Sequence, residues 1–357
     1  MPNVPHNRLT FDETEVSRIV EVVRSGYWAC GPKVAQLESA LKKKVGIAHA
    51  VCVASGSAAL RLTLKGLGVQ PGDTVLVPAY CCVALVNAVL ACHATPVTVD
   101  VRESDWNLDP GLVKDEIDRR QAKAIIAVNT FGAPAAVSEM QAGGVPVVED
   151  CAHAFGVAVN GVALGKRGSA AVLSFYATKL IGAGEGGAVL CDSPALAGFI
   201  AERRDYTDRA PGADRFNDKM TDLEAALGLC QLVRLDDMLE KRRIRSQRYE
   251  ERLGGLACNE RSYRLPETRS ERVWYRYAVE MLDRPASSVV SELRRYGINA
   301  EAPIDDWRPA DARACPVADR AYRGLVSLPL YPTLTDEEQD RVIQAFLSIC
   351  RGNPKET

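Results

Sequence analysis

Histidine is scarce in this chain, and so are long apolar runs. The 357 residues include four histidines, which argues against a histidine-rich metal protein. No apolar stretch approaches the roughly 20 residues that span a bilayer, and the N-terminal segment Met1-Pro-Asn-Val-Pro lacks the core of a signal peptide. We therefore expect a cytoplasmic protein.

The chain also lacks a surplus of either charge. Its formal net charge of -2 predicts neither a nucleic-acid partner nor a membrane-surface partner. Apolar residues at 47% and charged residues at 25% are ordinary for a globular enzyme. With 357 residues the chain is too long for one typical core, so its length predicts about two domains.

The eleven cysteines lack the spacing of a disulfide framework or a metal site. Their number is odd, they are scattered, and no CxxC pair occurs. This pattern is typical of reduced thiols. We expect neither disulfides nor a metal or iron–sulfur centre.

Residues 47–191 alternate strand-like apolar runs with helix-length segments, which is typical of a parallel sheet covered by helices. Ligands of such sheets gather at the carboxyl ends of the strands. The expected fold class is α/β, with seven strands at residues 50–53, 74–77, 96–101, 124–128, 145–148, 170–175 and 188–191.

The pattern changes after residue 191. A charged stretch over residues 221–253 predicts one long helix connecting two domains, followed by a strand at 273–279 and a helix at 285–296. Capping boxes at Thr10–Glu13 and Thr335–Glu338 are expected to open the first and last helices. These features predict a large domain over residues 1–230 and a small α+β domain over residues 231–357 that includes the connector.

Lys179 lies on the loop between the sixth and seventh predicted strands. An apolar setting lowers the pKa of a lysine and frees the neutral amine, which is a Schiff-base nucleophile. The alternative is a surface lysine whose stem packs on the sheet.

Three further sites follow predicted strands. The turn Ser55-Gly-Ser-Ala-Ala-Leu60 opens a helix and is either a phosphate cradle or an ordinary N-cap. Asp150 ends an apolar strand, where it can hold a pyridinium proton, and His153 can reach a phenolic oxygen. The alternative is a solvated acid beside a core histidine. Ser174 can add a hydroxyl to a phosphate site.

Together these residues supply the parts of a pyridoxal 5'-phosphate site. The chain resembles the DegT/DnrJ/StrS-type sugar aminotransferases over nearly its whole length. The motifs that carry this resemblance are Ser25-Gly-Tyr-Trp28, Ser55-Gly-Ser-Ala-Ala-Leu60, Pro71-Gly-Asp73, Glu149-Asp-Cys-Ala-His153, Ser174-Phe-Tyr-Ala-Thr-Lys179, Gly184-Glu-Gly-Gly187, Asn217-Asp-Lys-Met220 and Leu328-Pro-Leu-Tyr-Pro-Thr-Leu-Thr335.

The resemblance implies the fold of type I pyridoxal-phosphate transferases, with a role for each matching residue. Lys179 would form the internal aldimine, Asp150 would contact the pyridine nitrogen, and His153 would lie near the ring hydroxyl. The phosphate would be held by Gly56, Ser57, Ala58 and Ser174, together with Asn217 of a neighbouring subunit, which implies a homodimer. Cys82 stands where relatives usually place an aromatic ring against the cofactor, and Tyr80 is the alternative stacking group.

The implied activity is transfer of an amino group from an amino acid, L-glutamate or L-glutamine, to a keto sugar, a nucleotide-linked keto sugar or a keto cyclitol. Such an enzyme would serve sugar biosynthesis in secondary metabolism. One alternative is a sugar dehydratase of the same fold, but the retained Lys179 and the scattered cysteines count against it. The other is a non-catalytic regulator, which intact Lys179, Asp150 and Ser174 disfavour.

Overall fold

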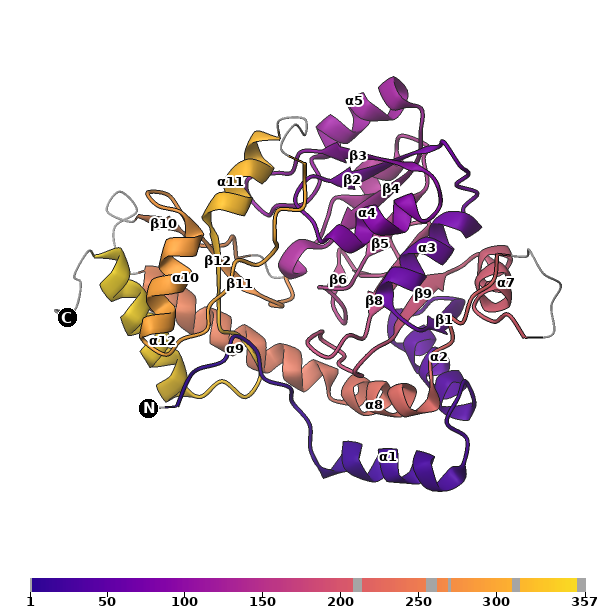
Figure 1. Cartoon of the computed structure of the whole chain (residues 1–357), viewed down its shortest axis with the longest axis horizontal. Coiled ribbons are helices and arrows are strands. Elements are labelled where there is room, and N and C mark those ends of the chain that lie inside the picture. Colours follow the sequence, from indigo (N-terminus) through magenta and orange to yellow (C-terminus); the bar gives the residue numbers. More distant parts are fainter. Residues whose placement is uncertain (1, 208–213, 255–261, 269–270, 310–314, 352–357) are drawn as a thin grey trace.

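The computed structural model describes residues 2–207, 214–254, 262–268, 271–309 and 315–351. Figure 1 shows a larger unit, in which helices cover a twisted sheet, and a smaller unit beside it. Across the described residues, no helix combines the length and apolar character needed to cross a bilayer.

A seven-stranded, mostly parallel sheet forms the centre of the larger unit, and it contains all seven predicted strands. Only β9 runs antiparallel to its neighbours. The predicted strand at 145–148 begins and ends two residues later, because Asp150 still pairs with Val128 and Val172. The spatial order is β1 (His49–Val53), β9 (Gly187–Cys191), β8 (Ala170–Ser174), β5 (Val147–Asp150), β4 (Ala122–Val128), β2 (Thr74–Pro78) and β3 (Thr95–Val99).

Helices cover both faces of this sheet because successive strand residues point to opposite sides. Val51 and Val53 pack in one cluster with α3 (Gly56–Gly66), α4 (Val83–Leu90) and α7 (Pro194–Arg203). Ala50 and Cys52 belong to the opposite cluster, together with α2 (Pro32–Val45) and α8 (Asp222–Val233). The remaining elements of this unit are α5 (Pro110–Arg120), η1 (Thr130–Gly132), α6 (Val137–Gln141), and the ribbon of β6 (Ala158–Val159) and β7 (Val162–Ala163).

The first helix, α1 (Glu13–Ser25), begins later than predicted. Its capping box uses Asp12 and Glu15, not Thr10 and Glu13: the Asp12 carboxylate accepts from the Thr14 amide at 2.7 Å, and Glu15 accepts from the Asp12 amide at 3.0 Å. The predicted capping position was therefore wrong by two residues. Figure 1 shows α1 at the edge of the molecule beside α8.

The predicted long helix over residues 221–253 is two helices. α8 ends at Val233, and α9 (Leu235–Gly254) begins after Arg234. The Arg234 guanidinium reaches back to α1, where it pairs with Asp12 at 2.7 Å and with Glu15. The single-helix prediction was wrong, because Arg234 has a φ of -94° and a ψ of 1° and ends α8.

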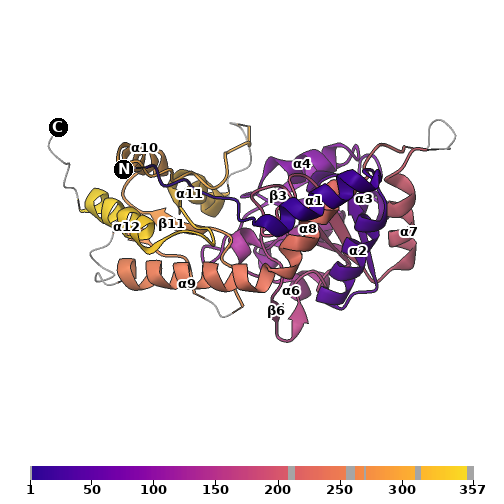
Figure 2. The ribbon, with the colours of Figure 1, turned by 90° about the horizontal axis from the view of Figure 1, so that it is seen from below.

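The smaller unit is a three-stranded antiparallel sheet with helices, and its last helix is opened by Thr335 and Glu338 as predicted. Its strands are β10 (Tyr263–Arg264), β11 (Tyr277–Met281) and β12 (Leu325–Leu328), and its helices are α10 (Ala286–Arg295), α11 (Pro316–Gly324) and α12 (Asp336–Cys350). Val4, near the N-terminus, packs into this core. Figure 2 shows α9 alongside these elements. A domain boundary at residues 230/231 stays a prediction.

The strand predicted over 273–279 begins only at Tyr277, because Val273 bonds elsewhere. The Val273 amide donates to the carbonyl of Gly132 at 2.9 Å. Gly132 has a φ of 91°, and a Cβ on it would overlap the Val273 carbonyl oxygen. The close approach of these two backbones therefore requires glycine at position 132.

Gly132→Ala is expected to lower the free energy of unfolding by about 3 kcal/mol or more. It combines left-handed strain of about 1–2 kcal/mol with overpacking of about 1–3 kcal/mol. Gly72→Ala is the matched control, since Gly72 has a φ of 87° and open space around its Cα, so only the strain applies. Urea unfolding of both variants measures the difference, and equal losses would contradict the proposed overlap.

Candidate active site

Seven of the predicted site residues line one cavity at the carboxyl ends of the parallel strands. They come from the turn after β1, the loop after β2, the end of β5 and the end of β8, as the topology of the sheet requires. These residues are Gly56, Ser57, Cys82, Asp150, His153, Ser174 and Lys179. Ala58 and Asn217 are the predicted site residues that do not line it.

Asp150 is a buried carboxylate with one strong internal partner. Its Oδ1 accepts from the Ala152 amide at 2.9 Å. Burial raises the pKa of this carboxyl, while the Ala152 amide and the charge of Lys179 act in the opposite direction. A cationic N–H donor placed in the cavity would stabilise the ionised form, because a buried charge is costly until it is paired.

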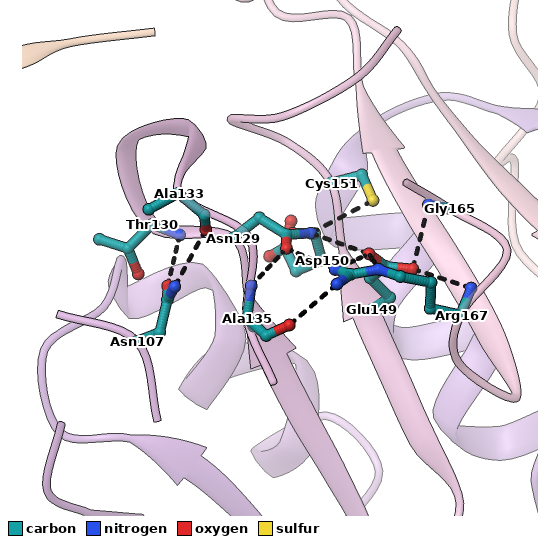
Figure 3. Close-up of polar contacts among 10 residues, drawn as sticks. All are labelled: Asn107, Asn129, Thr130, Ala133, Ala135, Glu149, Asp150, Cys151, Gly165 and Arg167. Carbon is teal, nitrogen blue, oxygen red and sulfur yellow. Dashed lines mark hydrogen bonds and ion pairs between the residues drawn. The ribbon is translucent and has the colours of Figure 1, made fainter. Parts of the chain in front are cut away.

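A network of buried polar groups fixes the strand that carries Asp150 (Figure 3). Glu149 is fully buried, and it accepts from Arg167 Nε at 2.9 Å and from the Gly165 amide at 3.0 Å. Arg167 also donates to Asn129 Oδ1 at 2.9 Å, and Asn129 donates to the Asp150 carbonyl at 3.2 Å. The Glu149 side chain therefore stabilises the fold, and the network connects β5 to the end of β4.

The turn after β1 approaches the end of β8 very closely. A Cβ on Gly56 would lie 3.0 Å from Ser174 Cβ, so a larger residue would displace the serine. The Ser55 hydroxyl caps α3 by accepting from the Ala58 amide at 3.1 Å, and Ala58 is buried beneath the cavity wall. The hydroxyls of Ser57 and Ser174 remain on the cavity side, where they can donate to an anion.

Lys179 and His153 meet at the ring of Tyr275. Lys179 Nζ lies 5.0 Å from the centroid of this ring, and the His153 ring stacks on it with centroids 4.4 Å apart and planes 13° apart. Burial lowers the pKa of His153, and the charges of Lys179 and Arg276 lower it further. The His153 imidazole is therefore neutral at pH 7, and its buried Nδ1 has no partner among the described residues.

Cys82 and Tyr80, the two candidates for covering a cofactor ring, have different surroundings. Cys82 is the exposed residue before α4 and lines the cavity. Tyr80 is fully buried, and its ring lies edge-on to Phe131 and Tyr322, with centroids at 6.1 and 4.7 Å. Tyr80 also lines the cavity, and these two ring contacts hold it in place.

Asn217 lies on the surface, outside the cavity of its own chain. Its neighbour Asp218 accepts through its carbonyl oxygen from the Ala54 amide at 2.7 Å, and Asp218 forms an ion pair with Arg61. The backbone around Asn217 is therefore anchored beside the start of α3. Its exposed side chain is available to another molecule.

Four contributors were not identified in the sequence. Tyr275 was assigned to an ordinary strand, and Glu149 was noted only as the first residue of a family motif. From the smaller unit, Ile304 lines the cavity and the Trp307 indole donates to the Cys81 carbonyl at 2.7 Å. The aromatic run from Trp274 to Tyr277 was the one available signal for Tyr275, because aromatic residues gather at sites as well as in cores.

Comparison with known proteins identifies close relatives of this arrangement. The sequence model of the DegT/DnrJ/EryC1/StrS aminotransferase family matches residues 10–347. The spore coat polysaccharide biosynthesis protein SpsC of Bacillus subtilis is 31% identical over 391 residues, covering 98% of this chain and 97% of that protein.

Two solved structures superpose closely on this chain. DesV of S. venezuelae, crystallised with a ketimine intermediate, is 31% identical, with a TM-score of 0.89 and complete coverage of both chains. NtdA of Bacillus subtilis, with its bound cofactor PMP, is 26% identical, with a TM-score of 0.88, covering 98% of this chain and 85% of NtdA. These similarities confirm the predicted fold.

The cavity fits the pyridoxal-type cofactor of these relatives. Asp150 offers a buried carboxylate for a ring N–H, and the unpartnered Nδ1 of His153 shows that the imidazole has hydrogen-bonding capacity to spare. The hydroxyls of Ser57 and Ser174 lie on either side of the glycine turn at Gly56. Lys179 adds a primary amine to the lining, and an amine of this kind can bind an aldehyde.

Glu149→Gln is expected to destabilise the fold by about 3–5 kcal/mol, because it leaves the Arg167 guanidinium buried without its carboxylate. Glu103→Gln is the control: Glu103 is half exposed and pairs with Arg264 and Arg320, so its loss should cost at most about 1 kcal/mol. Urea unfolding followed by circular dichroism checks both values. A loss at Glu149 no larger than that at Glu103 would show that the network is not a structural support.

Proposed function

Because the chain belongs to the DegT/DnrJ/EryC1/StrS aminotransferase family, we propose that it moves an amino group from an amino acid to a keto sugar, a nucleotide-linked keto sugar or a keto cyclitol, with Lys179 as the covalent anchor of pyridoxal 5'-phosphate. The chain is a pyridoxal-phosphate-dependent aminotransferase by family. The observation that supports the specific proposal is the single cavity shared by Lys179, Asp150 and Ser174.

Different residues of the cavity would hold different parts of the cofactor. Asp150 would hold the protonated ring nitrogen, His153 would contact the ring hydroxyl, and Ser57 and Ser174 with the turn at Gly56 would bind the phosphate. When bound, the cofactor supplies an electron sink for the carbanion formed at the amino-bearing carbon. A buried carboxylate at Asp150 favours this role, because it keeps the opposing ring nitrogen charged.

Lys179 would also move the proton of the reaction. Its Nζ projects into the cavity and lies over the Tyr275 ring at 5.0 Å, so its position is fixed by packing as well as by the loop. The Lys179 amide donates to the Tyr176 carbonyl at 2.8 Å, which closes the loop into a tight turn. A free amine at Nζ can accept a proton on one side of a substrate carbon and return it to the next atom.

The identity of the substrates rests on the relatives. SpsC is a polysaccharide biosynthesis protein, which supports a sugar-type acceptor for this chain. L-glutamate or L-glutamine is the proposed donor. Ile304, which lines the cavity from the smaller unit, would then contact the acceptor. A dehydratase is less well supported, because Lys179 is retained and reaches the cavity.

We further propose that the enzyme is a homodimer with shared sites. An apolar stripe on α1 is exposed, with Val16 and Val23 each 47% accessible, and such a surface is typical of a subunit contact. Tyr27 and Trp28, which follow α1, are also exposed. Asn217 would reach from this surface to the phosphate of the neighbouring subunit.

Lys179→Ala is expected to abolish the visible absorption of bound cofactor and to lower amine transfer by at least about 10²-fold, because it removes both the covalent anchor and the proton carrier. Lys123→Ala, at an exposed lysine of β4, should change neither property. Absorption spectra and a glutamate-dependent transfer assay provide the two measurements. A folded Lys179→Ala protein that keeps its band and its rate would refute the assignment.

Subunit sharing predicts complementation between two inactive variants. In a mixed dimer of Lys179→Ala and Asn217→Ala chains, one site combines the intact lysine of one chain with the intact asparagine of the other. Mixing the variants should therefore restore activity above that of either homodimer. If subunit exchange is verified by tagged pull-down and activity does not rise, Asn217 does not act across the interface.

A further inference from the structure

A second polar cavity is lined in part by Tyr275, and we call it the arginine cavity. Arg242 from α9 and Arg276 from the segment before β11 line it, together with His6, Glu301 and Thr178. None of these five residues has a part in the cofactor site described above. One of its lining residues, Thr178, directly precedes Lys179 in the chain.

Arg242 is a buried cation without a carboxylate partner among the described residues. It is 5% exposed, and both of its hydrogen bonds use Nη1, which donates to the carbonyls of Tyr275 at 3.2 Å and Leu330 at 3.0 Å. Burial lowers the pKa of Arg242 to about 10. Buried guanidinium groups are normally paired with an anion, so this arrangement indicates an anion that arrives with a ligand.

The other charged groups leave the cavity with a net positive charge. Arg276 donates to His6 Nε2 at 3.3 Å, and Glu301 lies 3.1 Å from His6 Nδ1 and 3.7 Å from Arg276. Burial, the largest influence, lowers the pKa of His6, so this imidazole is neutral at pH 7. Glu301 is the one acid in the lining, and it balances one of the two guanidinium groups.

The arginine cavity and the amine of Lys179 have Tyr275 as a common neighbour. Arg276 Cζ lies 5.6 Å from the Tyr275 ring centroid, and Lys179 Nζ lies 5.0 Å from the same centroid. A third cavity is lined by Lys179, Thr178 and Arg242, so it borders both Lys179 and the arginine cavity. Asn7 lines both the arginine cavity and the third cavity, and its buried Oδ1 has no partner among the described residues.

We infer that the arginine cavity binds a carboxylate of the amino-acid donor, with Arg276 and Arg242 as its specificity-determining residues. This inference rests on the proposed function, because it requires a donor whose amine reaches Lys179. An amino acid carries a carboxylate within a few bonds of its amine, so a donor seated on the two guanidinium groups presents its amine toward the Tyr275–Lys179 side. The unpartnered Asn7 Oδ1 is an acceptor for an N–H of the same donor.

Glutarate is a suitable probe, because it has the carboxylates of a donor but no amine and cannot react. Calorimetric titration of the holoenzyme with glutarate should show binding, and Arg276→Gln should weaken it by at least about tenfold, as expected for a hydrogen bond to a charged group. Arg276→Lys keeps the charge and should restore part of the affinity. Arg243→Gln is the control, since Arg243 follows Arg242 on α9 but is exposed and pairs with Glu240.

Kinetics supply a second measurement that separates this inference from the proposed function. Arg276→Gln should raise the KM for the amino donor by at least about tenfold, while the KM for the keto acceptor stays within twofold. Active wild-type enzyme with equal glutarate affinity in wild type and Arg276→Gln would overturn the inference and leave the function standing. Loss of affinity for uridine diphosphate instead of glutarate would also overturn it, by assigning the cavity to an acceptor phosphate.

Discussion

The buried pair of Glu149 and Arg167 is the interaction on which the geometry of the site depends. A fully buried carboxylate is tolerated only with several donors, and here two backbone amides, the Arg167 guanidinium and Asn129 provide them. The same Arg167 and Asn129 also hold the carbonyl of Ala135 and the end of β5. The carboxylate of Asp150, one residue further on, therefore projects into the cavity from a rigid base.

Much of the larger unit follows from local sequence pattern. Apolar runs bounded by glycine, proline or polar residues identify the central strands, because a strand buried on both faces has to be apolar throughout. The edge strand β3 contains two threonines and is only partly buried. Strand ends then identify Asp150, Ser174 and Lys179, since parallel strands bring their carboxyl ends together. The sheet topology thus links residues that are more than a hundred positions apart, such as Gly56 and Ser174.

The parts that sequence pattern missed depend on contacts between distant segments. The helical pattern runs on through Arg234, where α8 ends. The ion partners of Arg234, Asp12 and Glu15, are more than 200 residues away, so local pattern does not reveal them. Val273 fits a strand by composition, but its amide bonds to Gly132. Tyr275 is an ordinary strand aromatic until its stacking on His153 is known. Periodicity records only the nearest neighbours in the chain, so it contains no signal for these three features.

The residues that line the cavity come from both the larger and the smaller unit. Lys179, Asp150 and Ser174 lie at or after strand ends of the sheet, whereas Ile304 comes from a segment of the smaller unit. The Trp307 indole of that segment donates to the Cys81 carbonyl in the loop after β2. Because that contact uses a backbone oxygen, it places no demand on the side chain at position 81. Exchange of the 304–307 segment between homologues would therefore change one wall of the cavity while Lys179, Asp150 and Ser174 stay in place.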